Sequence, residues 1–135
     1  MTSVNRATRE IIGWTVMSHP QRSERTFQTV IDQAPAARVY FSDAFGIYQV
    51  LQYPAGSIHI PMLDRSQTYT VEGVNADLRT YLGRLKRGSR CFTRSLAGLR
   101  RAMKLFVHYY NLCQVYRLEH NGILASPSEL VSVAF

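Results

Sequence analysis

The sequence predicts an α/β fold in which a mixed sheet is flanked by helices, and two observations lead to it. Over residues 11–61, short runs rich in β-branched and aromatic residues alternate with segments of helical periodicity. Over residues 70–118, two longer segments carry apolar residues at helical spacing. Strands that alternate with helices bury their apolar faces in layers, so we expect the helices to lie against the sheet.

The first half of the chain supplies the strands. It predicts strands over residues 11–17, 37–41 and 57–61. It also predicts a helix over residues 24–34 and a short helix or turn over residues 45–51. The side chains expected on the inner face of the helix are Phe27, Val30 and Ile31, and those expected together on one side of the short segment are Phe45, Tyr48 and Leu51. Ser23 is a candidate N-cap for the first helix, and Pro35 marks its end. The last strand is expected at the edge of the sheet, because Pro61 has no N–H to give to a central ladder.

The second half predicts two helices and a tail. The first helix should run over residues 70–88 and the second over residues 95–118. Their buried faces are read from apolar spacing: Val71, Val74, Leu78, Leu82 and Leu85 in the first, and Leu99, Met103, Phe106, Tyr110 and Cys113 in the second. Residues after Gly122 are expected to be a loosely held tail, so the predicted domain covers residues 1–118 and the tail residues 119–135.

The positive charge is confined to one part of the chain. Residues 1–64 hold five basic and five acidic side chains, whereas residues 65–117 hold eleven basic and two acidic ones. The overall net charge is +7. A basic segment of this kind predicts contact with a polyanion such as nucleic acid. A surface of acidic lipids is the rival explanation, and we rank it lower because the charge spreads over two predicted helices and their connection.

Cysteine usage and hydropathy add little to the functional assignment. Cys91 and Cys113 show neither a CxxC nor a paired histidine spacing, so neither a zinc site nor a redox pair is predicted. The start of the sequence has no charged-then-apolar signal segment, and no run of about 18 apolar residues would span a membrane. A reducing bacterial cytoplasm, with the protein near the nucleoid, is the expected location.

Two acidic residues are candidates for a shared site. Glu72 and Arg79 lie seven residues apart, about two helical turns, and so share a polar face with Asn75 and Lys86. Asp43 follows a predicted strand, at the edge of the sheet where α/β proteins form their sites. The plainer readings are a solvated Glu/Arg face and a turn-forming aspartate.

The segment from Arg65 to Arg79 resembles the hallmark of insertion-sequence-one family transposases, with its order Arg-Ser-Gln-Thr-Tyr-Thr-Val-Glu-Gly-Val-Asn-Ala-Asp-Leu-Arg. The segments Tyr81–Arg87 and Ser89–Ser95 are similar to the same family, as is Tyr40–Asp43. The similarity covers residues 5–117. It implies an RNase H-like core that cuts and joins DNA with divalent metal ions, Mg²⁺ or Mn²⁺.

In that family three acids hold the metal ions. By resemblance, Asp43 matches the second acid and Glu72 the third, which makes both residues candidate catalytic and metal ligands. Arg79 matches a basic residue that contacts DNA near the cut phosphate. The other expected DNA contacts are Arg84, Lys86, Arg87, Arg90 and Arg94, since arginine and lysine bind phosphate oxygens.

The chain departs from the family pattern at its first acid. That acid belongs on a strand upstream of the turn at Arg6–Arg9, and the preceding residues are too few for two strands and a turn. We therefore expect an N-terminally truncated transposase with little or no activity, which binds DNA at insertion-element ends and target. The alternative is a fragment without chemistry that binds DNA or dimerises, and so modulates a full-length transposase. An unrelated RNase H-like nuclease is a weaker option.

Overall fold

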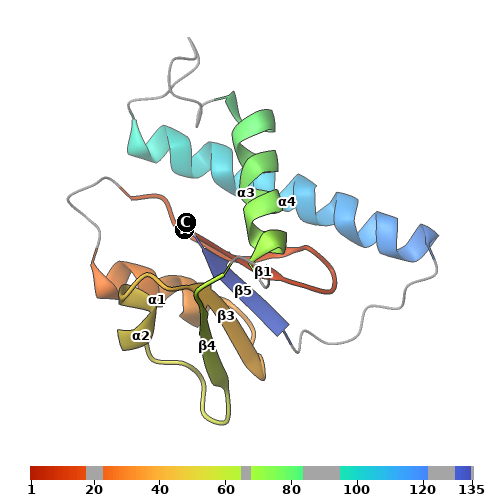
Figure 1. The fold of residues 1–135 in the computed structure, drawn as a ribbon. Coiled ribbons are helices and arrows are strands. Elements are labelled where there is room, and N and C mark those ends of the chain that lie inside the picture. The colour runs from red at the N-terminus through yellow and green to blue at the C-terminus, as the bar shows by residue number, and fades with distance from the viewer. Residues whose placement is uncertain (18–22, 65–67, 84–94, 122–129, 135) are drawn as a thin grey trace.

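The computed structural model describes residues 1–17, 23–64, 68–83, 95–121 and 130–134, and it is a mixed α/β fold (Figure 1). Its elements are β1 Thr2–Asn5, β2 Ile11–Trp14, α1 Glu24–Gln33, β3 Val39–Asp43, α2 Ile47–Val50, β4 Ile58–Met62, α3 Tyr69–Tyr81, α4 Leu96–His120 and β5 Leu130–Ala134. The predicted α/β class is confirmed. The predicted elements that begin between residues 11 and 95 are present, but the helix predicted over residues 70–88 ends at Tyr81, and its predicted core residue Leu85 lies outside the described residues. In the described residues, no helix is long and apolar enough to cross a membrane.

The sheet is mixed and has the strand order β2-β1-β5-β3-β4. Strand β1 is antiparallel to both β2 and β5. Strand β3 is parallel to both β5 and β4. The sheet therefore consists of a hairpin on one side and a parallel pair on the other, and β5 joins them. As predicted, the proline-bearing strand β4 lies at an edge.

The prediction of a tail over residues 119–135 is wrong for residues 130–134, because they form the central strand of the sheet. The β5 register sets Ser132 opposite Val4 of β1 on one side and opposite Phe41 of β3 on the other. Helix α4 also runs to His120, two residues beyond the predicted domain boundary. The division at residue 118 therefore cuts α4 two residues before its end and separates β5 from the sheet to which it belongs.

The hairpin formed by β1 and β2 corrects a second prediction, since no strand was expected before residue 11. Thr2–Asn5 forms β1, and Asn5 closes the turn to β2 by accepting a hydrogen bond from the Ala7 N–H at 3.0 Å. Arg9 takes a positive φ of 61° in this turn, and its N–H donates to the Asn5 carbonyl at 2.8 Å. Four strand residues with one large apolar side chain, Val4, give almost no periodic signal.

Helices α1 and α2 cover one face of the sheet. The predicted N-cap is confirmed, because Ser23 accepts a hydrogen bond from the Thr26 N–H. The predicted inward residues Phe27, Val30 and Ile31 are all buried. The core on this side also contains Ala37, Tyr40, Tyr48 and Leu51. Of the three residues predicted on one side of the 45–51 segment, Tyr48 and Leu51 are buried, whereas Phe45 is half exposed, with its ring centroid 6.2 Å from that of Tyr48.

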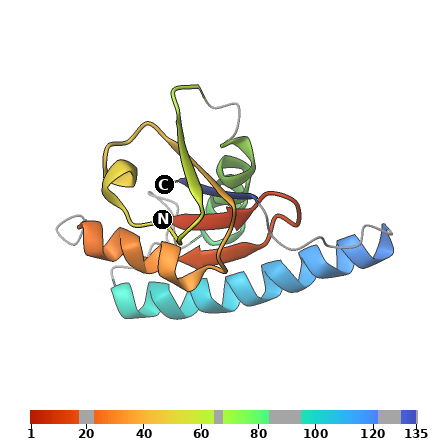
Figure 2. The same cartoon turned by 90° about the horizontal axis from the view of Figure 1, so that it is seen from below.

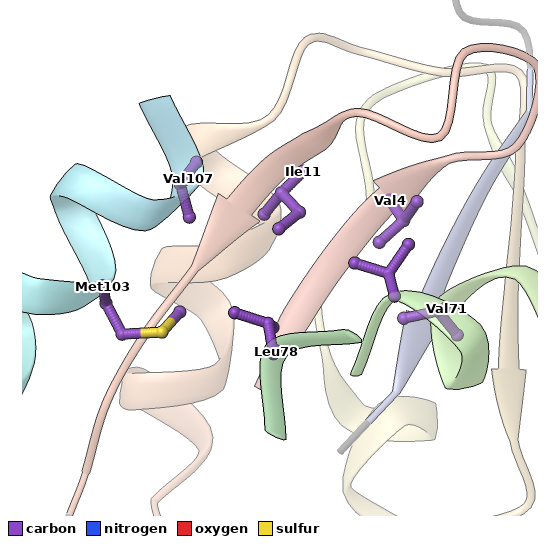
Figure 3. Packing of buried hydrophobic residues seen from close by; sticks show 7 residues of the cluster. Val4, Ile11, Val71, Leu78, Met103 and Val107 are labelled. Carbon is purple, nitrogen blue, oxygen red and sulfur yellow. The ribbon is translucent and has the colours of Figure 1, made fainter. Parts of the chain in front are cut away.

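Helices α3 and α4 cover the other face, and Figure 2 shows α4 running along one border of the molecule. Their apolar stripes meet β1 and β2 in the cluster drawn in Figure 3, which contains Val4, Ile11, Val71, Val74, Leu78, Met103 and Val107. Two predictions about these stripes are wrong. Asn75 is buried rather than solvated, and its Oδ1 accepts a hydrogen bond from the Thr2 hydroxyl at 2.7 Å. Cys113 is exposed, and the neighbouring Gln114 is buried in its place.

The free edge of β2 is covered by side-chain amides. Asn111 of α4 accepts a hydrogen bond from the Ile11 N–H and donates one to the Ile11 carbonyl, both at 2.9 Å. Gln33 of α1 accepts from the Trp14 N–H at 3.2 Å. An edge strand exposes unpaired backbone groups that can recruit other strands, so these amides complete the edge.

The Asn111 contact gives a matched pair of variants. Asn111→Asp should destabilise the protein by about 1–2 kcal/mol, because the carboxylate cannot donate to the Ile11 carbonyl and faces it with like charge. Gln33→Glu keeps the only function used there, that of an acceptor, and should be close to neutral. Chemical denaturation of the two variants checks this. Equal losses of unfolding free energy would contradict the role assigned to the Asn111 donor.

Candidate functional site

Asp43 is the last residue of β3 and is half-buried. Its Oδ1 accepts a hydrogen bond from the Phe45 N–H at 3.2 Å, which is the turn-forming role considered as the plainer reading. Its negative charge also reaches Tyr48. Burial raises the pKa of the Tyr48 hydroxyl, and the Asp43 carboxylate raises it further. Asp43 therefore shapes the turn after β3 and acts electrostatically on the buried Tyr48 at the start of α2.

Glu72 lies in the first turn of α3 and is also half-buried. It accepts a hydrogen bond from the Thr68 hydroxyl at 3.3 Å, one turn earlier. An acid in the first helical turn is favoured by the helix dipole. Because β3 and β4 are parallel and six residues link Met62 to Tyr69, α3 begins at the edge of the sheet where β3 ends (Figure 1). Asp43 and Glu72 thus come from elements that meet at one edge.

Arg6, in the β1–β2 turn, ties these elements together. Its guanidinium carbon lies 4.9 Å from the ring centroid of Phe41 on β3 and 5.8 Å from that of Tyr69 on α3. The interaction with Arg6 lowers the pKa of the exposed Tyr69 hydroxyl. Both distances are within cation–π range. A positive charge therefore stands between the strand that carries Asp43 and the helix that carries Glu72.

Two further arginines line α3. Arg9 lies 3.9 Å from the Asp77 carboxylate, and its guanidinium approaches Gly73, one residue after Glu72. This ion pair is half exposed on both sides, so its contribution to stability is small. Arg79 is exposed in the last turn of the helix. The predicted Glu72–Arg79 face therefore exists on α3, while its Asn75 belongs to the core and its Lys86 lies outside the described residues.

The remaining DNA-contact predictions fall outside the part of the chain that the structure describes. They are Arg84, Lys86, Arg87, Arg90 and Arg94. The arginines that sequence reasoning missed are Arg6 and Arg9. Two arginines close together before a predicted strand are visible in the sequence, but only the fold shows that this turn lies against α3.

The predicted metal site rests on two acidic side chains, Asp43 and Glu72. Among the described residues, no group of three or more His, Cys, Asp or Glu side chains could hold a metal ion. The central strand β5 contains no acid in its sequence Leu-Val-Ser-Val-Ala. A two-ion centre needs several shared carboxylate oxygens. The two-ion centre that the resemblance implies therefore stays a prediction, and we assign Asp43 and Glu72 no cutting step.

A serine–histidine pair lies beside Asp43 and has a structural role. The Ser42 hydroxyl donates to the Asp43 carbonyl at 2.8 Å, so its contact with His59 Nε2, also 2.8 Å, needs the proton on the nitrogen. Ser42 is fully buried, which keeps substrates away from its oxygen. The His59 ring stacks on Tyr53 at 4.5 Å. The pair therefore links β3 to β4 through a side-chain hydrogen bond.

His59 makes stability depend on pH. Burial lowers the pKa of His59 from its ordinary value of 6.5, so the folded protein favours the neutral ring. The resulting stability is fully present above pH 6.5 and is lost as the pH falls through 6.5 toward the folded-state value. We expect the melting temperature to fall from pH 7.5 to pH 5, and to fall less in His59→Gln. Parallel melting curves for both proteins across this range would exclude His59 as the cause.

Comparisons with protein-family models, with curated proteins and with solved structures found no match to this chain.

Proposed function

We propose that this chain is a DNA-binding protein of the transposase type, with an RNase H-like core that holds DNA without cutting it. The observation that carries the proposal is the position of Arg6 between Phe41, on the strand that ends in Asp43, and Tyr69, on the helix that carries Glu72, with Arg9 close to Gly73. The carboxyl ends of parallel strands are where α/β sheets bind their ligands. A mixed sheet with helices on both faces supports the RNase H-like assignment at the level of architecture.

Charge supports DNA as the partner. Between residues 65 and 117 the chain carries nine more basic than acidic side chains. Arg79 extends this basic segment onto the exposed face of α3, two turns from Glu72. Binding to phosphates through such side chains releases counterions, which makes the affinity fall steeply with salt. Any Mg²⁺ or Mn²⁺ at Asp43 and Glu72 would need DNA phosphate oxygens as further ligands.

Duplex DNA binding, measured by fluorescence anisotropy at salt concentrations from about 50 to about 200 mM, tests the proposal. Neutralising Arg84, Arg87 and Arg90 together should weaken binding and lower the salt slope by about two to three. The matched control is Arg25→Gln, on α1 and exposed on the other face of the sheet, which should change neither. A wild-type affinity that does not depend on salt would overturn the proposal.

Cleavage separates this proposal from its alternative, a transposase fragment with residual catalysis. In a nicking assay with Mg²⁺ or Mn²⁺ on DNA carrying the element ends, we expect no products from the wild-type chain. If products form and Glu72→Ala removes them while DNA binding is retained, the chain is an enzyme. Efficient cleavage by the wild-type chain would refute the proposal that it holds DNA without cutting it.

A further inference from the structure

Helix α4 carries a second apolar stripe, on the side opposite its core-facing one. Its core side includes Met103 and Val107, which are buried. On the opposite side, Leu105, Tyr109, Leu112 and Tyr116 are 52–61% exposed, and they follow one another at steps of four, three and four residues. This alternation is the spacing of a coiled-coil seam. Between residues 105 and 116 the sequence has no Lys, Arg, Asp or Glu.

The structure assigns this seam to a second copy of the chain: we propose that two α4 helices pack antiparallel about a two-fold axis midway between residues 110 and 111. That axis sets Leu105 opposite Tyr116 of the second copy, and Tyr109 opposite Leu112 of the second copy. Each tyrosine then faces a leucine. The same contacts form twice, as a two-fold interface requires.

The surface near the start of α4 has room for such a partner. An open hollow of about 700 Å³ lies there, lined by α4 residues that include Ala102, Leu105 and Tyr109, and by Leu82 at the end of α3. The proposed axis brings Tyr116 of the second copy to Leu105, at this hollow. An aromatic side chain is the kind of anchor that fills an interface pocket.

Charge at the ends of the seam favours the antiparallel arrangement. Arg101 and Glu119 both lie at the border of the seam, one near each end of the helix. The antiparallel axis places Arg101 beside Glu119 of the second copy, twice. A parallel pair would instead keep Arg101 far along the helix from Glu119 of the second copy, and would align the two helix dipoles.

The exposed area is adequate for a weak, reversible dimer. The exposed parts of the seam side chains, with Val115 at their border, amount to roughly 500 Å² per copy, because such side chains present about 150–250 Å² when free. Two copies would bury about 1,000 Å², the lower limit for a specific interface. Nucleic acid is a poorer occupant, since the seam offers no charge to phosphates.

Sedimentation velocity without DNA, from about 1 to 200 μM, tests the dimer independently of the proposed function. We expect dimers to be half populated near roughly 10 μM, and Leu112→Lys to weaken the association at least about tenfold. The matched control is Leu63→Lys, the same change at a 97% exposed position outside the seam, which should have no effect. Circular dichroism melts establish that both variants remain folded.

A charge exchange tests the direction of packing. Glu119→Arg alone should weaken the dimer, and combining it with Arg101→Glu should restore it, because the two sites face each other only in the antiparallel pair. If the double variant is weaker than the single one, the antiparallel arrangement is wrong. A wild-type chain that stays monomeric at 200 μM, or a Leu112→Lys variant that dimerises as the wild type does, overturns the proposal.

Discussion

Gly13→Ala is expected to destabilise the protein by about 3 kcal/mol, and to lower its melting temperature by roughly 10 °C. Gly13 is buried in β2, where α1 crosses the strand. A Cβ at this position would collide with the Val30 carbonyl oxygen of α1 and would lie 2.6 Å from the Ser3 hydroxyl. The Val30 oxygen belongs to a helix backbone, so relief requires α1 to move away from the sheet. Thermal and chemical unfolding measure the loss.

Gly46→Ala is the matched control for this variant. Gly46 has a φ of −55° and a ψ of −25°, which alanine adopts without strain, and an added Cβ would meet nothing within 4 Å. We expect no loss of stability. A gain of up to about 0.5–1 kcal/mol in unfolding free energy is expected, because alanine lowers the conformational entropy of the unfolded chain. If the two alanine variants melted together, close packing of α1 on β2 would not be the reason for the glycine.

Ser132→Pro is expected to have the largest effect of all, a loss of more than about 3 kcal/mol, with insoluble protein as its outcome. Strand β5 has neighbours on both sides, so the N–H that proline lacks faces another strand. Without β5, the edges of β1 and β3 have no partner between them, and open edges of this kind aggregate. Soluble yield and circular dichroism of the purified chain report the result.

Ser132→Thr keeps the backbone N–H and controls for the side chain. It should be soluble and close to the wild type in stability, because threonine suits a strand. A chain that ends at residue 121 should behave like the proline variant. If either disrupted form stayed soluble and kept the wild-type spectrum, β5 would not be the strand that joins the two halves of the sheet.

Elements with local signals were predictable from the sequence, whereas strands β1 and β5, which lack such signals, were not. The α1 boundaries follow from Ser23 and Pro35, which act within one turn of the helix. Strand β5 is five residues long and follows a 25-residue helix, so nothing near it in the sequence identifies its partners. Those partners, β1 and β3, lie about ninety or more residues away along the chain.

The candidate site was predictable in part, for the same reason. Asp43 and Glu72 lie on the predicted elements, because a strand end and a helix start are local features. The burial of Asn75 depends on Thr2, 73 residues earlier, so a polar residue on a polar stripe gave the wrong prediction. The place of Arg6 between Phe41 and Tyr69 likewise needs three elements brought together.

The position of β5 also sets the order of events during synthesis. The strand at the centre of the sheet is made after every other strand and helix described here. While the ribosome is still extending the chain, at about 5–20 residues per second, the hairpin and the parallel pair can form but cannot join. Both halves must therefore wait with open edges for several seconds, during which chaperones have the greatest opportunity to protect them.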